Sequence, residues 1–268
     1  MKTLARIATV FFVVAVPVFL VTANVRFVAS DTWFHQRGFR QHDVDETTDI
    51  DFAQLDAADE DLVRYFEDDR STLRIQVDMD GRDESLFNEE ETLHMRDVKS
   101  LMRAIYRLNE VSLAIILAYV GAVVLWSKER SVRDLARYSL FGVGVGFVLV
   151  GAVGAFALTG FDAAWTAFHE VAFRNDAWRL DPDTDRLIQM FPEPFWQEMT
   201  YLVAAMTLVE VLVVVGVAVG YLVFGRGRDF TSPSGAPGHV EFLVGDVGEE
   251  ERGSEPASAR KWNPFRRR

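Results

Sequence analysis

The sequence predicts a helical membrane protein in which four transmembrane helices carry a small extracytoplasmic α+β cap. Two observations lead to this fold class: apolar residues gather in four long blocks, and acidic residues crowd into the segments between them. The blocks cover residues 4–23, 106–126, 140–158 and 201–224. At a rise of about 1.5 Å per residue, helices of this length cross a hydrocarbon core of about 30 Å.

The composition excludes several classes of site. The 268 residues include no cysteine, so the chain has no disulfide framework, no thiolate metal site and no cysteine nucleophile. The formal charge of −12 argues against nucleic acid as a partner, because binding phosphate needs a basic face.

The first block, residues 4–23, has two interpretations. Lys2 and Arg6 beside an apolar run are also typical of a signal peptide. The run is longer than the apolar region of a signal peptide, about 7–15 residues, which favours an uncleaved span. Pro17 predicts a kink, which a membrane helix tolerates when its neighbours satisfy the freed carbonyl group.

Basic residues gather in three segments: the start of the chain, the link between the second and third blocks, and the region after the fourth block. The positive-inside rule places all three segments in the cytoplasm, which an even number of spans allows. The loops at about 25–105 and 159–198 then form an extracytoplasmic cap on a membrane domain of residues 1–225. The basic residues are Lys2, Arg6, Lys128, Arg130, Arg133, Arg137, Arg226, Arg228 and the arginines at 266–268.

Residues 226–268 are rich in Gly, Pro, Ser and Glu and predict a disordered cytoplasmic tail. The basic end of this tail suits either contact with anionic lipid or a purely solubilising role.

The first cap loop contains one clear strand pattern. Residues 73–79 alternate apolar and polar side chains and lead into Asp80-Gly81, a turn signal. One strand needs partners, and residues 25–27 and the region around Phe39 are candidates. The sequence therefore predicts a small sheet in the cap.

Helical patterns fill the rest of the cap. Residues 56–66 have helical spacing of their apolar positions, and a second helix starts at about Ser85 and runs into the second block. In the second cap loop, Asp181 followed by Pro182 predicts a helix start with Asp181 as N-cap.

Five histidines are candidates for chemistry. His239 lies in the predicted tail, and His35 and His42 lie in a polar stretch where a solvated histidine is the default interpretation. His94 and His169 are different, because we expect both at the boundary between cap and bilayer. There they could act as a general base and a general acid. The alternative is that each is a structural histidine bonded to a carbonyl group.

Carboxylates and aromatic residues surround these two histidines in the sequence. On a helix, Glu90 and Asp97 share a face with His94 and could orient its ring. The aromatic residues indicate either an interfacial belt or a water-poor pocket for a lipid, and the two interpretations are compatible. They are Trp165, Phe168, Phe173, Trp178, Phe191, Phe195 and Trp196, of which we assign Phe168, Phe173 and Trp178 to the substrate pocket together with Asp97.

The sequence does not favour a metal or another cofactor. The run Asp181–Asp185 looks like a calcium loop, but Arg186 and Pro192 stand where an EF-hand needs Gly and Glu. A site made of both histidines with Glu90 or Glu170 is conceivable, yet nothing resembles H-E-x-x-H. We expect no metal and no cofactor.

One acidic residue lies within a predicted span. Glu210 falls near the middle of the fourth block, where a carboxyl group needs protonation or a partner. It suits either a proton path or an interhelical hydrogen bond. The pairs Gly142/Gly146 and Gly216/Gly220 predict faces where helices pack closely.

Two longer segments carry more information together than separately. The first, LFNEEETLHMRDVK, covers residues 86–99 and contains His94; the second covers residues 168–193, begins FHEVAFRNDAW and contains His169. Together they resemble the bacterial lipoprotein intramolecular transacylases and the wider group of four-span membrane proteins to which those belong. The resemblance covers roughly residues 1–225 and leaves the tail unmatched.

The resemblance implies an acyl transfer at the outer membrane face, with membrane lipid and lipoprotein as partners. The sn-2 acyl chain of a lipoprotein's diacylglyceryl group would move to the α-amino group of its N-terminal cysteine. The family's two histidines match His94 and His169. Such a reaction needs a base for an ammonium with a pKa near 8 and an acid for the departing alkoxide.

Two other functions stay open. The chain could be a non-enzymatic envelope protein of the same family, whose cap binds a lipid or lipoprotein partner and whose histidines are structural. It could also be a proton-coupled transporter that uses Glu210, which the few polar residues of the other spans disfavour.

Overall fold

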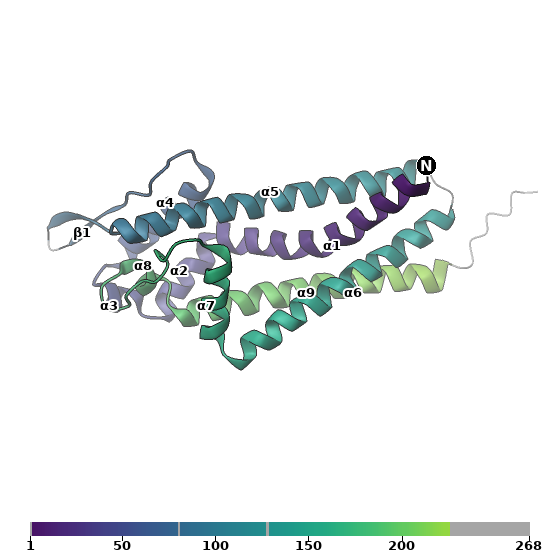
Figure 1. Ribbon diagram of the computed structural model, residues 1–268. Coiled ribbons are helices and arrows are strands. Elements are labelled where there is room, and N and C mark those ends of the chain that lie inside the picture. Colours follow the sequence, from purple (N-terminus) through teal and green to yellow (C-terminus); the bar gives the residue numbers. More distant parts are fainter. Residues whose placement is uncertain (1, 80, 127–128, 226–268) are drawn as a thin grey trace, which may run out of the picture. The chain divides into compact units, whose positions relative to one another are not determined.

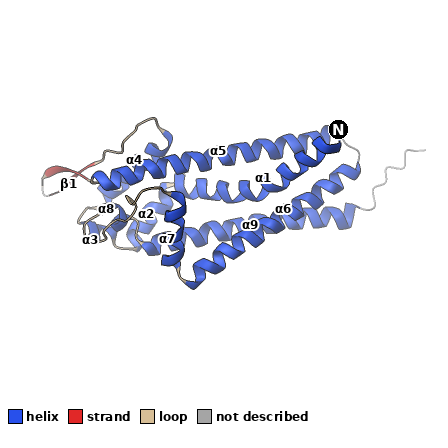
Figure 2. Cartoon of the chain, in the orientation of Figure 1, coloured by secondary structure: helices blue, strands red, loops and turns tan. Residues whose placement is uncertain are grey.

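The computed structural model describes residues 2–79, 81–126 and 129–225, and helices predominate in them (Figure 2). The predicted tail, 226–268, lies outside the described residues. The helices are α1 (Lys2–Ser30), α2 (Thr32–Gln41), α3 (Val44–Thr48), α4 (Phe52–Glu67), α5 (Glu89–Trp126), α6 (Glu129–Thr159), α7 (Phe161–Ala172), α8 (Arg186–Met190) and α9 (Glu193–Phe224), and the strands are β1 (Gln76–Met79) and β2 (Arg82–Ser85).

The long helices α1, α5, α6 and α9 lie side by side (Figure 1). Helix α1 packs against α5, α6 and α9, and α6 packs against α9. In the described part of the chain, three of these helices are long and apolar enough to cross a membrane: α1, α5 and α9. They confirm the first, second and fourth predicted blocks as apolar helices. The third block lies in α6, and its span stays a prediction.

Glycines let α6 approach α1 closely. A Cβ atom at Gly142 would lie 2.7 Å from the backbone oxygen of Val13, and one at Gly146 would collide with Pro17. Without side chains at these two positions the helix backbones come together, as in other small-residue interfaces of membrane helices. The close-packing face predicted at Gly216 and Gly220 is wrong, because no described atom lies within 4 Å of a Cβ built at either position.

Polar side chains connect α1 to its neighbours inside the bundle. The amide Nδ2 of Asn24 donates to Thr207 Oγ1 and to Glu210 Oε2, each at 3.0 Å. A third hydrogen bond joins α1 to α5, where Asn109 Nδ2 donates to Thr22 Oγ1 at 3.2 Å. Glu210 therefore has an interhelical hydrogen-bond partner, which was one of its two predicted roles.

Beyond the apolar parts of these helices, the short elements share one hydrophobic core. It is assembled from α2, α3, α4, the segment around β1, the N-terminal part of α5, α8 and the start of α9. Its least exposed side chains include Phe39, Val44, Leu55, Tyr65, Leu73, Met190 and Phe195. Helices α2 and α4 each begin after an aspartate that caps the helix. The side chains of Asp31 and Asp51 accept hydrogen bonds from backbone N–H groups of the first turn.

The predicted strand is present over Gln76–Met79, but its predicted partners are wrong. It pairs in antiparallel fashion with the next segment of the chain, with Gln76 opposite Ser85 and Met79 opposite Arg82. Residues 25–27 lie in α1, and Phe39 lies in α2. The nearest segment supplied the partner because Gly81, at φ +78°, closes a short turn at little entropic cost.

Two predicted helix starts also need correction. Helix α5 begins at Glu89 rather than near Ser85, because Ser85 belongs to β2. Helix α8 begins at Arg186, with Asp185 rather than Asp181 at the N-cap position. Asp181 instead lies in a turn, where its carbonyl oxygen accepts the N–H of Asp185 at 2.8 Å and its N–H donates to the carboxylate of Asp185.

The glycine contact predicts a matched pair of substitutions on α6. Gly142→Ala should destabilise the protein by about 1–3 kcal/mol, because the added methyl group meets the α1 backbone. Gly144→Ala is the control, since a Cβ there has no described atom within 4 Å. Thermal unfolding of both variants in detergent measures the difference, and equal midpoints would contradict the packing of α6 on α1.

Candidate functional site

His94 and His169 lie next to each other although they come from different helices. His94 lies on α5, ahead of the apolar block at 106–126, and His169 lies on α7, near its end. Their ring centroids are 5.9 Å apart and the ring planes are inclined by 35°. Both residues are buried, with 8% and 6% of their surface exposed. The structure thus brings together the two histidines that the sequence singled out.

The start of α5 is attached to the loop that follows α7. Asn88 and Glu91 form a reciprocal cap, in which the N–H of Glu91 donates to Asn88 Oδ1 and the N–H of Asn88 donates to Glu91 Oε2. The second carboxylate oxygen, Glu91 Oε1, accepts the N–H of Leu187 at 2.6 Å. Asn88 Nδ2 also donates to Asp185 Oδ1 at 2.9 Å.

A second attachment lies one turn beyond His94. Asp97 Oδ2 accepts a hydrogen bond of 2.7 Å from Asn175 Nδ2, in the segment just after α7. Asp97 thus contacts the loop that carries Trp178, in keeping with its predicted place beside the site. The two attachments lie on either side of His94 along α5 and hold α7 and its loop against that helix.

Aromatic rings enclose the His169 imidazole. Its centroid lies 4.7 Å from that of Trp165, 5.2 Å from that of Phe168 and 5.0 Å from that of Trp178. Phe173 lies beside both histidines, with its centroid 5.0 Å from that of His94 and 5.5 Å from that of His169. All three aromatic residues assigned to the pocket from the sequence therefore contact the histidine pair.

The enclosure is apolar but not closed on all sides. Phe168 is 43% exposed and Val171 is 90% exposed, so α7 presents apolar side chains outward beside the pair. Figure 1 shows α7 lying across the direction of α6 and α9, close to where the short elements begin. A helix in this position, with an exposed apolar face, suits the boundary between water and lipid.

One hydrogen bond determines the tautomer of His169. Its Nδ1 lies 2.8 Å from the carbonyl oxygen of Trp165. A carbonyl oxygen can only accept, so Nδ1 carries the hydrogen, and Nε2 of the neutral ring holds the free lone pair. The basic nitrogen of His169 is thus the one that faces away from its own helix.

Burial keeps both rings neutral. Desolvation, together with the neighbouring His169, lowers the pKa of His94 to about 4, while Asp97 opposes this shift. Desolvation also lowers the pKa of His169, and the bond to the Trp165 carbonyl opposes that change. Both imidazoles are therefore uncharged at neutral pH and can accept a proton.

His35 and His42 lie away from the pair. His35 is buried, so its predicted solvated state is wrong: its Nδ1 lies 2.8 Å from Asp59 Oδ1, and its ring edge packs on Phe191 and Phe195. Burial raises the pKa of Asp59, and the bond to His35 opposes this. These contacts make His35 part of the core formed by the short elements.

The carboxylates considered for a metal site do not join the histidines. Glu90 and Glu170 are both exposed. Over residues 2–79, 81–126 and 129–225, no three side chains of His, Cys, Asp or Glu gather closely enough to hold a metal ion.

The residues that position the pair have weak sequence signals or none. Asn88-x-x-Glu91 is a capping pattern that could have identified the start of α5. The role of Glu91 in holding Leu187, and that of Asn175 in holding Asp97, depend on contacts between distant segments and leave no local signal. In the sequence, nothing distinguishes Trp165 from the other aromatic residues of its segment.

The low pKa of His94 predicts acid sensitivity. An unfolded histidine binds a proton below about pH 6.5, but folded His94 does so only near pH 4, so its contribution to stability is complete above 6.5 and declines as the pH falls toward 4. His94→Gln should flatten the fall of the thermal midpoint across that window. Tryptophan fluorescence melts in detergent at pH 7, 5.5 and 4 measure this, and parallel curves would contradict a neutral, buried His94.

The comparisons with known proteins identify the family and support the fold. The family model described as lipoprotein intramolecular transacylase Lit matches residues 10–196. The structure of the membrane integral Lit from Bacillus cereus superposes with a TM-score of 0.69 at 16% identity, covering 84% of this chain and 99% of that one. Two structures of the same bacterial protein, with a histidine replaced by arginine or by alanine, superpose with TM-scores of 0.65 at 15% identity and cover 84% of this chain and 95% and 96% of theirs. No curated protein matches the chain by sequence. The chain is a membrane protein that belongs to the lipoprotein intramolecular transacylase Lit family.

Proposed function

We propose that the chain moves the sn-2 acyl chain of a lipoprotein's diacylglyceryl group to the α-amino group of its N-terminal cysteine. The observation that carries this proposal is the pair of buried, neutral imidazoles of His94 and His169, 5.9 Å apart, on a chain of the Lit family. The fold likeness to the Bacillus cereus Lit supports the same reaction class.

The reaction needs proton transfer but no protein nucleophile. The amine, after losing its ammonium proton to solvent, attacks the ester carbonyl and forms the C–N bond. The bond between the acyl carbonyl carbon and the ester oxygen then breaks, so the oxygen stays on the glyceryl group. One proton leaves the nitrogen, and one proton joins the departing oxygen. The products are an amide and a free sn-2 hydroxyl group, so a single proton moved from nitrogen to oxygen completes the balance.

We assign the base role to His169, because the Trp165 carbonyl fixes its tautomer and leaves Nε2 as the proton acceptor. His94 is the other member of the pair and would guide the proton toward the departing oxygen. Such proton transfer contributes about 10²–10⁴-fold to a rate. Holding amine and ester together inside one lipoprotein contributes about 7–11 kcal/mol more to lowering the barrier.

The alternative, a non-enzymatic protein with two structural histidines, accounts less well for His94. A structural histidine bonded to a carbonyl describes His169 through Nδ1. No described residue, however, forms a hydrogen bond with either ring nitrogen of His94, although only 8% of the residue is exposed. Neither nitrogen is among the fully enclosed atoms without a partner, so His94 has a nitrogen that a substrate can reach.

The transporter alternative loses support from the contacts of Glu210. Asn24 donates to its carboxyl group and to Thr207 at the same time, which is the pattern of an interhelical attachment.

We further propose that α1, α5, α6 and α9 all span the membrane, with both chain ends in the cytoplasm. Lys128, the arginines in the first turns of α6 and those that follow α9 in the sequence support this orientation. The histidine pair would then face the outer leaflet, where the substrate's acyl chains lie, and α7 would lie along its surface.

Histidine substitutions test the reaction. His94→Ala and His169→Ala should each lower acyl transfer by about 10²–10⁴-fold, because each removes one proton-transfer group. The transfer does not change the mass of the lipoprotein, so tandem mass spectrometry of the N-terminal lipopeptide must locate the acyl group on nitrogen or on oxygen. His42→Ala is the matched control, since His42 lies outside the pair, 3.6 Å from Glu198. An acylation pattern unchanged by either substitution in the pair would refute the proposal.

Single cysteines test the orientation, because the natural chain has none. Arg82→Cys in β2 should react with a membrane-impermeant maleimide on whole cells. Arg137→Cys in α6, whose arginine side chain is 62% exposed, should react only after the cells are permeabilised. The reverse pattern would place the histidine pair on the cytoplasmic side.

A further inference from the structure

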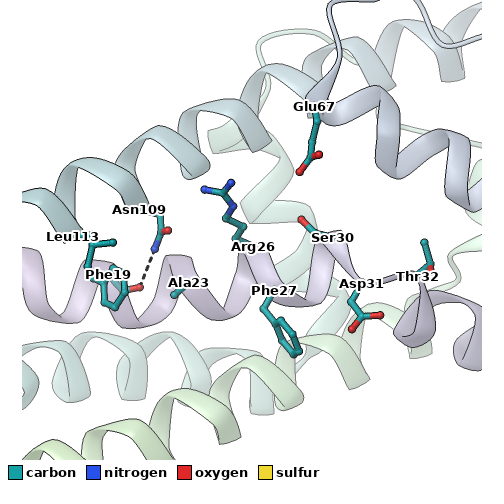
Figure 3. Close-up of a pocket in the computed structure, with 10 residues that line it drawn as sticks. All are labelled: Phe19, Ala23, Arg26, Phe27, Ser30, Asp31, Thr32, Glu67, Asn109 and Leu113. Carbon is teal, nitrogen blue, oxygen red and sulfur yellow. Dashed lines mark hydrogen bonds between the residues drawn. The ribbon is translucent and has the colours of Figure 1, made fainter.

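A cavity away from the histidine pair runs along α1 and α5 (Figure 3). Its volume is about 670 Å³, within the range of about 300–1,000 Å³ typical of ligand sites. Neither His94 nor His169 lines it. We call it the α1 groove.

The α1 groove changes from apolar to polar along its length. Phe19, Ala23 and Leu113 form one end, on parts of α1 and α5 that belong to the apolar blocks (Figure 3). Asp31, at the start of α2, and Glu67, at the end of α4, lie toward the other end. This order matches a molecule with an apolar chain and a polar head, aligned with the helices.

Arg26 stands between the two ends with its guanidinium held in place. Its Nη1 donates to Glu110 Oε1 at 3.0 Å, and its Cζ lies 4.7 Å from the centre of the Tyr106 ring. Arginine has five N–H donors, so most stay available to an oxyanion in the groove. The side chain is 37% exposed, which leaves it open to a ligand.

The acidic side chains of the α1 groove have fewer protein partners than Arg26 has. In the described part of the chain, no cation pairs with the carboxylate of Glu67 or of Asp31. One oxygen of Asp31 accepts the N–H of Trp33, which caps α2. The other oxygen and the whole carboxylate of Glu67 can therefore receive a positive group from a ligand.

We propose that the α1 groove binds a bilayer phospholipid whose head group carries both a phosphate and an ammonium. The phosphate would contact Arg26, the ammonium would contact Glu67 and Asp31, and an acyl chain would cover Phe19 and Leu113. A purely anionic head group fits poorly, because one guanidinium is accompanied by three carboxylates when Glu110 is included.

Native mass spectrometry of the delipidated full chain in detergent tests this proposal. Phosphatidylethanolamine and phosphatidylglycerol with identical acyl chains are the probes. The natural chain should bind phosphatidylethanolamine in preference. Glu67→Gln combined with Asp31→Asn should weaken that binding by about fivefold or more, because the ammonium loses its partners. Asparagine keeps the cap on α2, so folding should be unaffected.

The control is Glu60→Gln, an exposed acidic residue on α4 that does not line the α1 groove. It should leave phosphatidylethanolamine binding unchanged, and Arg26→Gln should weaken it. Equal binding of the two phospholipids, or equal effects of the paired variant and the control, would overturn the proposal. The proposal would also be overturned if binding of a diacylglyceryl lipopeptide depended on both carboxylates while binding of phosphatidylethanolamine did not. Both histidines are intact in every variant, so the result is independent of acyl transfer.

Discussion

The arrangement of the site depends on one buried carboxylate. Glu91 is 1% exposed, and burial raises its pKa, which two backbone hydrogen bonds oppose. One bond goes to Asn88 at the start of α5 and the other to Leu187 in the first turn of α8. Helix α8 has no side-chain cap of its own, so Glu91 satisfies one of its free N–H groups. A carboxylate buried at such a cost keeps its partners in fixed positions, since losing one would leave it unsatisfied.

The consequences of that attachment extend to the histidines. It holds the start of α8 against α5, and the bond between Asp97 and Asn175 holds the segment after α7 nearly two turns further along α5. His169 and His94 then lie next to each other, with Phe173 beside both, in surroundings that disfavour charge. The same apolar enclosure that lowers both pKa values would strengthen the interactions of a polar transition state, because few water molecules screen it.

Polar groups on α1 serve two different purposes along its length. Within the bundle, the amide group of Asn24 donates to two side chains of α9, and these contacts connect α1 to α9. Nearer the short elements, Arg26 and the acidic residues of the α1 groove have capacity left for a ligand. Polar side chains whose hydrogen bonds are made within the protein join the helices. Polar side chains with free donors or acceptors mark places where another molecule can bind.

The sequence by itself determined the apolar helices, the helical class and the two histidines. Length and hydropathy suffice for a span, because a helix in lipid satisfies its own backbone. The motifs around His94 and His169 suffice for a family. The sequence also placed Phe168, Phe173 and Trp178 beside the pair, since they lie within ten residues of His169.

Only the tertiary structure decided how these parts meet. The partner of β1, the start of α8 and the choice between the two predicted glycine faces were each decided by which neighbour came within reach, which local patterns do not encode. The same holds for Glu91, whose second hydrogen bond joins residues 96 positions apart. The tautomer of His169 and the low pKa of His94 follow from burial and from one carbonyl group, and both are properties of the folded chain alone.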